Sequence, residues 1–107
     1  MPYDVHITKA KSWLLSKNNP IVTDEVNQLV DSDSELSWSQ SDYIEMLNDK
    51  KETVRHYAIL WNGQPKFLHV DGEIRCSNPD KKTIAKMREI AKELGAIVQG
   101  DEDEVYK

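Results

Sequence analysis

Apolar and polar residues alternate in several short stretches of the chain, a pattern typical of β-strands with one buried face. In residues 3–9 apolar side chains occupy positions 3, 5 and 7, with polar residues between them. The alternation places Val5 and Ile7 toward a core and His6 and Thr8 toward solvent. The stretch therefore predicts a half-buried strand.

Further strands are predicted where β-branched and aromatic residues cluster between turn signals. Residues 41–47 fit either a helix or a strand, and we favour a strand because a turn and a clear strand follow. The predicted strands are residues 36–38, 41–47, 53–61, 66–70, 73–77 and 96–99, with a final edge strand at 104–106.

A tight hairpin is predicted around Asp71-Gly72, because Asp-Gly between two strands favours a two-residue turn with positive φ at both positions. This turn sets the register, so that Val70 lies opposite Glu73. Directly opposed residues share a face of the sheet. The predicted core face of this hairpin holds Phe67, His69, Ile74 and Cys76.

Two segments show the spacing of amphipathic helices. The first runs from a cap at Thr23 to about Ser32. The second runs from a cap at Asp80 to Leu94 and ends at Gly95, which suits the left-handed position that closes a helix. Its apolar stripe consists of Ile84, Met87, Ile90, Ala91 and Leu94.

The combined pattern predicts the α+β class, with a mainly antiparallel sheet and two helices packed on one of its faces. The element order is β-α-β-β-β-β-α-β. A chain of 107 residues suits one domain, which we expect to span residues 1–107.

Composition narrows the setting in which the protein acts. No apolar run approaches the length of a membrane helix, and the N-terminus lacks a signal-peptide pattern. The single cysteine, Cys76, fits a reducing compartment, so we expect a cytoplasmic protein. The net charge of −5 disfavours nucleic acid as a partner, and we expect no membrane partner either.

The charge is uneven, because residues 21–52 contain nine acids and two lysines. An acidic surface that carries aromatic residues suits a basic protein partner. We therefore expect a small non-enzymatic protein-binding domain, of which an immunity-like inhibitor of a basic partner is one form. The candidate partner-binding residues are Trp13, Asp31, Asp33, Glu35, Trp38 and Tyr43. The alternatives are a homo-oligomer with a structural or regulatory role and a small enzyme without a recognisable motif.

No group of residues predicts a catalytic, cofactor or metal site. His6, His56 and His69 lack the spacing of a compact zinc site. Cys76 and His69 are diagonal neighbours on a core face, where a thiol behaves as a small apolar group. The acids at positions 31, 33, 35 and 42 follow a calcium-loop spacing, but the required glycine is absent.

The outward face of the last predicted helix is basic. We assign to it Lys81, Lys82, Lys86, Arg88 and Lys92. Two of these lysines lie in the first turn, where the helix dipole disfavours cations. We expect acids of residues 101–104 to lie nearby.

Both ends of the chain carry motifs that together resemble a group of short uncharacterised bacterial proteins. The opening motif is Tyr3-Asp4-Val5-His6-Ile7-Thr8-Lys9, followed by Trp13. The closing motif comprises Asn78-Pro79-Asp80, Thr83-Ile84, Lys86-Met87, Ile90-Ala91, Leu94-Gly95-Ala96, Val98-Gln99-Gly100-Asp101 and Glu104-Val105-Tyr106. The resemblance covers about half the chain and implies a bacterial, cytoplasmic, single-domain protein. It implies no activity and no functional residue.

Overall fold

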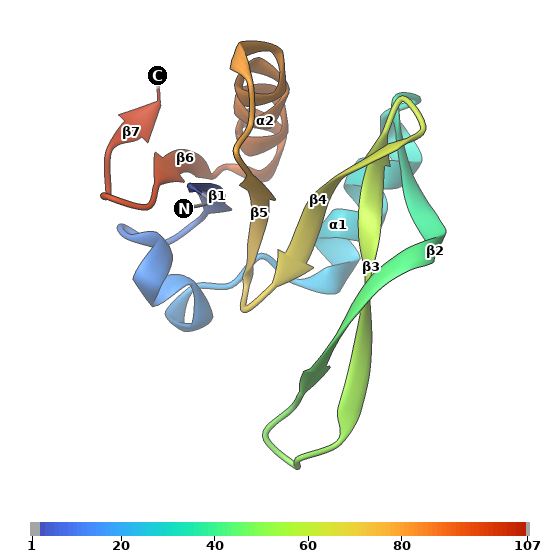
Figure 1. The fold of residues 1–107 in the computed structure, drawn as a ribbon. Helices are drawn as coiled ribbons and strands as arrows, with labels where there is room; N and C mark the ends of the chain where they lie inside the picture. The colour runs from blue at the N-terminus through green and yellow to red at the C-terminus, as the bar shows by residue number, and fades with distance from the viewer. Residues whose placement is uncertain (1–2, 107) are drawn as a thin grey trace.

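The computed structural model describes residues 3–106 and shows a seven-stranded sheet with helices against it (Figure 1). The strand order is β2-β3-β4-β5-β1-β6-β7, and neighbouring strands are antiparallel. The strands are β1 Asp4–Thr8, β2 Leu36–Leu47, β3 Thr53–Trp61, β4 Gln64–Val70, β5 Glu73–Ser77, β6 Ile97–Gly100 and β7 Val105–Tyr106. The helices are η1 Trp13–Asn18, a 3-10 helix, α1 Thr23–Ser32 and α2 Lys81–Leu94. The predicted α+β class is confirmed.

The two α-helices begin and end close to the predicted residues. Asp80 caps α2, because its carboxylate accepts a hydrogen bond from the backbone N–H of Thr83 at 2.8 Å. Gly95 closes α2 in the left-handed conformation, with φ of 67°. In α1 the cap falls one residue earlier than predicted, at Val22, whose N–H is bound by the side chain of Glu25. No helix of residues 3–106 has the length and apolarity needed to cross a membrane.

The hairpin between β4 and β5 has the predicted register. Val70 pairs with Glu73 and His69 with Ile74, and both Asp71 and Gly72 have positive φ. The core lies between the sheet and the two α-helices. Its fully buried members include Ile7, Val26, Ile59, Phe67, Ile74, Met87 and Ile90.

The expectation of a solvent-facing side on the first strand is wrong. His6 and Thr8 are as buried as the core residues beside them, with exposed fractions of 1% and 0%. The cause is η1, which begins at Trp13 and covers this part of the second sheet face with Ser16. Alternation along a strand shows which side chains share a face, but it does not show what lies against that face.

The strands β2 and β3 form an arm that extends beyond the rest of the sheet (Figure 1). The predicted strands at 36–38 and 41–47 are one continuous β2, with an irregularity between Trp38 and Tyr43. Strand β3 pairs with β2 at residues 53–57 and 59–61, but it pairs with β4 only at Ile59, Leu60 and Trp61. Residues 40–57 are therefore a two-stranded ribbon, which we call the arm.

Two glycines in tight turns provide a matched test of this packing. Gly63 and Gly72 both have positive φ, near 80°. A Cβ on Gly72 would lie 2.7 Å from the carbonyl oxygen of Ser16, whereas a Cβ on Gly63 would meet nothing within 4 Å. Gly63→Ala should lower the free energy of unfolding by roughly 1–2 kcal/mol through backbone strain alone. Gly72→Ala should cost about 1–3 kcal/mol more, because η1 must shift. Urea unfolding of both variants checks this, and equal losses would contradict the packing of η1 against the turn.

Candidate functional site

A charged group lies inside the molecule, where β1, β5 and the β6–β7 turn meet. His6 and Glu73 are each 1% exposed, and Nδ1 of His6 is hydrogen-bonded to a carboxylate oxygen of Glu73. On the other side of the ring, Nε2 lies 2.7 Å from Oδ1 of Asp101. The imidazole is therefore held between two carboxylates.

Neighbouring side chains complete this buried group. Arg75 donates from Nε to Glu73 at 3.2 Å, and the hydroxyl of Ser16 lies 3.4 Å from the other Glu73 oxygen. The Trp13 ring stacks on the His6 ring with centroids 4.1 Å apart and planes 1° from parallel. The indole N–H of Trp13 is the one buried side-chain polar group without a partner in residues 3–106. Trp13, a candidate partner anchor, is thus half-buried against His6.

The surroundings of His6 favour the charged form of its imidazole. Burial lowers the pKa of His6, but the hydrogen bonds to Glu73 and Asp101 outweigh burial and raise it above its usual value. Partial burial raises the pKa of Asp101, but the hydrogen bonds from the Asp4 N–H and His6 outweigh burial and lower it. When His6 is protonated, His6 and Arg75 supply two positive charges beside the carboxylates of Glu73 and Asp101.

This arrangement resembles an acid–base relay, but His6 and Glu73 are each only 1% exposed, so their reacting atoms are closed off from solvent. Neither residue, nor Asp101, lines any of the five best-formed surface cavities of residues 3–106. A general base must reach the proton that it abstracts. We therefore assign this group a structural role, in which it fastens η1 and the β6–β7 turn to the central strand.

The charged state of His6 predicts a pH-dependent stability. Because folding raises the pKa of His6 above 6.5, the stabilisation is complete below pH 6.5 and is lost as the pH rises through the folded-state pKa. His6→Gln should lower the free energy of unfolding by about 2 kcal/mol at pH 6. It should also remove the decline above pH 6.5. Urea unfolding from pH 6 to 8.5 measures both effects.

His56→Gln is the matched control, because His56 lies on the arm and makes no hydrogen bond or ion pair in residues 3–106. This variant should keep the pH dependence of the unmodified chain. If the unmodified chain and His6→Gln have parallel pH profiles, the imidazolium does not stabilise the fold.

The arm carries four exposed apolar side chains that could contact another molecule. Tyr43, Ile44 and Val54 are each 37–39% exposed, and Leu47 is 69% exposed. The guanidinium of Arg55 lies 4.5 Å from the centre of the Tyr43 ring, at a distance that suits a cation–π contact. Tyr43 is the predicted partner-binding residue that the structure places most clearly on an open surface.

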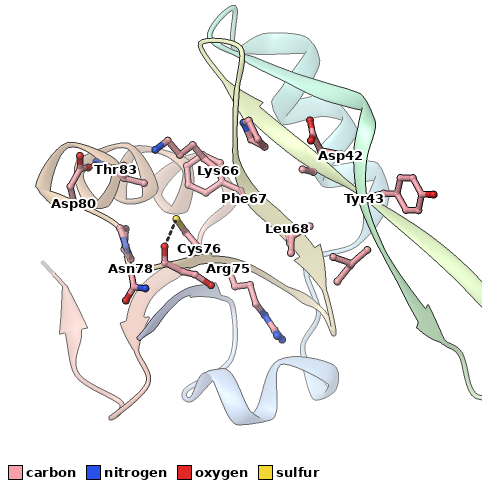
Figure 2. Close-up of a pocket in the computed structure, with 15 residues that line it drawn as sticks. Asp42, Tyr43, Lys66, Phe67, Leu68, Arg75, Cys76, Asn78, Asp80 and Thr83 are labelled. Atoms are coloured by element: carbon pink, nitrogen blue, oxygen red, sulfur yellow. Dashed lines mark hydrogen bonds between the residues drawn. The ribbon is translucent and has the colours of Figure 1, made fainter. Parts of the chain in front are cut away.

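Two cavities lie beside the arm, and they are the largest of the five. The first, of about 460 Å³, extends from Tyr43 and Ala58 past Leu68 to the N-terminus of α2 (Figure 2). The second, of about 610 Å³, is lined by aromatic and histidine side chains that include Trp38, His56, Tyr57 and His69. Both are open to solvent.

Two of the predicted acidic residues are engaged inside the molecule. Lys86 is 4% exposed, and its Nζ lies 2.7 Å from Oδ2 of Asp33 and 2.7 Å from Oε1 of Glu35. The assignment of Lys86 to the outward face of the helix is therefore wrong. The two ion pairs join α2 to the loop between α1 and β2.

The acids of residues 101–104 do not form ion pairs with the two lysines in the first turn of α2. Asp101 binds His6, Asp103 accepts a hydrogen bond from Ser12, and Glu104 binds the hydroxyl of Tyr3. Lys81 and Lys82 form no ion pair within the described residues. The expectation that these acids lie beside the two lysines is wrong.

The other candidate residues are dispersed. Asp31 is exposed at the end of α1. Trp38 is half-buried, and its indole N–H donates to Asn27 of α1 at 3.1 Å. The six candidates therefore do not form one surface.

The structure also shows the surroundings of the histidines and the cysteine considered for a metal site or an activated thiol. Residues 3–106 contain no cluster of three or more metal-ligating side chains. His69 is hydrogen-bonded through Nε2 to the carbonyl oxygen of Ile21 at 2.6 Å. Cys76 is buried, and burial raises the pKa of its thiol. No Cys76–His69 hydrogen bond is present, so the two do not form an activated pair.

The ion pairs of Lys86 can be tested against its helix neighbours. Lys86→Ala should cost about 2 kcal/mol, because it empties a buried position and leaves Asp33 without its cation. Lys92→Ala on the exposed face should stay within about 0.5 kcal/mol of the unmodified chain. NMR titration gives a second readout, since Lys86 now lowers the pKa of Asp33, which should return toward its usual value. An unchanged Asp33 titration would contradict the contact.

Comparison with known proteins found no matching family, no similar curated protein and no similar solved structure. The resemblance of the two chain ends to short bacterial proteins therefore stays a prediction.

Proposed function

We propose that this chain is a non-enzymatic protein-binding domain and that the arm is its binding element. The observation that carries the proposal is a two-stranded ribbon with Tyr43, Ile44, Leu47 and Val54 exposed on it. A ribbon of two strands is only marginally stable in water by itself. A partner that covers these side chains would stabilise the arm and gain apolar contact area.

The tip of the arm supports a binding role, because it is well ordered by its own hydrogen bonds. The side-chain oxygen of Asn48 accepts from the backbone N–H groups of Lys50 and Glu52, each at 2.9 Å. Lys51 adopts positive φ to complete the turn. An element that is already ordered loses little conformational entropy on binding.

The charges of the arm favour a partner contact that is mainly apolar. Of the nine acids in residues 21–52, Glu25, Asp33 and Glu35 form ion pairs with Lys9 or Lys86. The four acids of the arm are offset in part by three cations, Lys50, Lys51 and Arg55. A basic partner surface is supported mainly beside α1, where Asp24 and Asp31 are exposed and form no ion pair within residues 3–106.

The proposal can be tested by capture of partners from extracts of the organism that carries the gene. The test variant is Ile44→Thr with Leu47→Thr, which removes exposed apolar surface and keeps β-branched residues in the strand. The loss of two anchors of about 0.7 kcal/mol each should weaken binding about tenfold. The captured protein is then purified, and its Kd is measured by calorimetry.

Leu14→Thr with Leu15→Thr is the matched control, because these leucines are 68% and 49% exposed on η1, which is not part of the arm. The control should bind as the unmodified chain does. Equal affinity of the arm variant, or no partner for the unmodified chain, would overturn the proposal.

A further inference from the structure

The sheet splits where β3 separates from β4, and both strands then present an unpaired edge. The last paired residues before the split are Ile59 of β3 and Phe67 of β4. Beyond this pair, residues 53–57 of β3 are paired only with β2, and residues 68–70 of β4 only with β5, within the described chain. We call the space between these two edges the fork.

The two larger cavities described above, of the five in residues 3–106, lie along the fork. The first is lined by Ala58 on the β3 side and by Lys66, Phe67 and Leu68 on the β4 side (Figure 2). The second is lined by residues 54–57 of β3 and by His69 of β4. Both strand edges therefore border open space, into which side chains of an added strand could project.

Cationic side chains outnumber acidic ones in the lining of the two cavities, which contains Arg55, Lys66 and Arg75 against Asp42 and Asp80. Arg55 and Lys66 line the cavities, and neither forms an ion pair with a described residue. The two acids in the lining, Asp42 and Asp80, are already hydrogen-bonded to Ser39 and Thr83. Because opposite charges on neighbouring strands attract, cations without an ion pair favour an occupant of the fork that carries acidic groups.

We propose that the fork binds one extended segment of a partner protein, in which apolar residues alternate with acidic residues, as an added strand. Unpaired N–H and C=O groups of strand edges bind extended segments through main-chain hydrogen bonds, and side-chain cavities provide the specificity. The apolar side chains would lie against Ala58 and Leu68, and the acids near Arg55 and Lys66. This inference rests on the proposed function and names the form that the partner takes.

The shape of the fork favours a single segment over a second copy of this chain. The Ile59–Phe67 pair and the Asn62-Gly63 turn close one end of the fork. A folded copy could offer the outer edge of β2, but that strand is already held in the arm by β3. A flexible segment can enter from the open end, and a ribbon needs more room.

The experiment is selection of random ten-residue peptides, displayed on phage, against the full-length chain. The expected selected sequences alternate apolar and acidic residues. Arg55→Glu with Lys66→Glu should reverse the selected charge from acidic to basic and weaken the original peptides at least about tenfold, the equivalent of 1.4 kcal/mol. Arg88→Glu with Lys92→Glu on the outer face of α2 is the matched control and should select the original sequences.

The place and mode of binding are read on the strongest selected peptide. Amide hydrogen exchange should slow at residues 53–57 and 68–70, and N-methylation of alternate peptide bonds should abolish binding in one of the two possible registers. No enrichment, no preference for acids, or protection only on the outer edge of β2 would overturn the inference. A rise in mass to that of a dimer without peptide would favour a second copy and also overturn it.

The outcome remains separable from that of the proposed function. If the arm variant loses its partner while Arg55→Glu with Lys66→Glu retains it, the arm binds and the fork does not. If neither variant loses a partner, both proposals fail.

Discussion

The burial of a carboxylate on the second face of the sheet is the constraint on which the rest of the structure depends. Glu73 is 1% exposed in β5, and an unpaired carboxylate at that depth would cost several kcal/mol. Strand β1 must therefore bring His6 beside it, and the turn after β6 must bring Asp101 to the other ring nitrogen. These contacts join residues from three distant parts of the sequence.

The two sides of the sheet differ in how much of their surface the helices cover. At β1 and β5, η1 covers one face and the α-helices cover the other, so His6 and Ile7 are both buried. At the other side, β2 and β3 extend past the helices and form the arm (Figure 1). The buried contacts are thus concentrated around β1. Leu47 can be exposed on the arm because it is not part of the core.

Local signals in the sequence predicted the parts of the fold that depend on neighbouring residues. Asp71-Gly72 set the hairpin register, and Asp80 with Gly95 set the ends of α2. Residues 53–61 formed the predicted strand because their β-branched and aromatic side chains suit a pleated surface. In each case the deciding interaction lies within a few residues of the chain.

The candidate site depended on contacts that no local pattern contains. Lys86 lies 53 residues from Asp33 in the sequence, so its position on the helix did not reveal its ion pair. The burial of His6 required η1, a short 3-10 helix without strong periodicity. One signal was present, since the predicted register set Glu73 opposite the apolar Val70. That pairing indicated a covered face, which alternation alone had assigned to solvent.

The split between β3 and β4 separates the proposed binding surface from the stabilising core. One extra residue in β4 near Pro65 shifts the register, and the strands diverge after Ile59 and Phe67. If β3 and β4 had remained paired, the arm would be part of a continuous sheet, and neither strand would have an unpaired edge facing the other. The divergence therefore leaves main-chain groups and apolar side chains on the same element without a partner. A surface that combines both features matches an extended protein segment better than a small molecule, because only a polypeptide supplies a complementary row of main-chain groups.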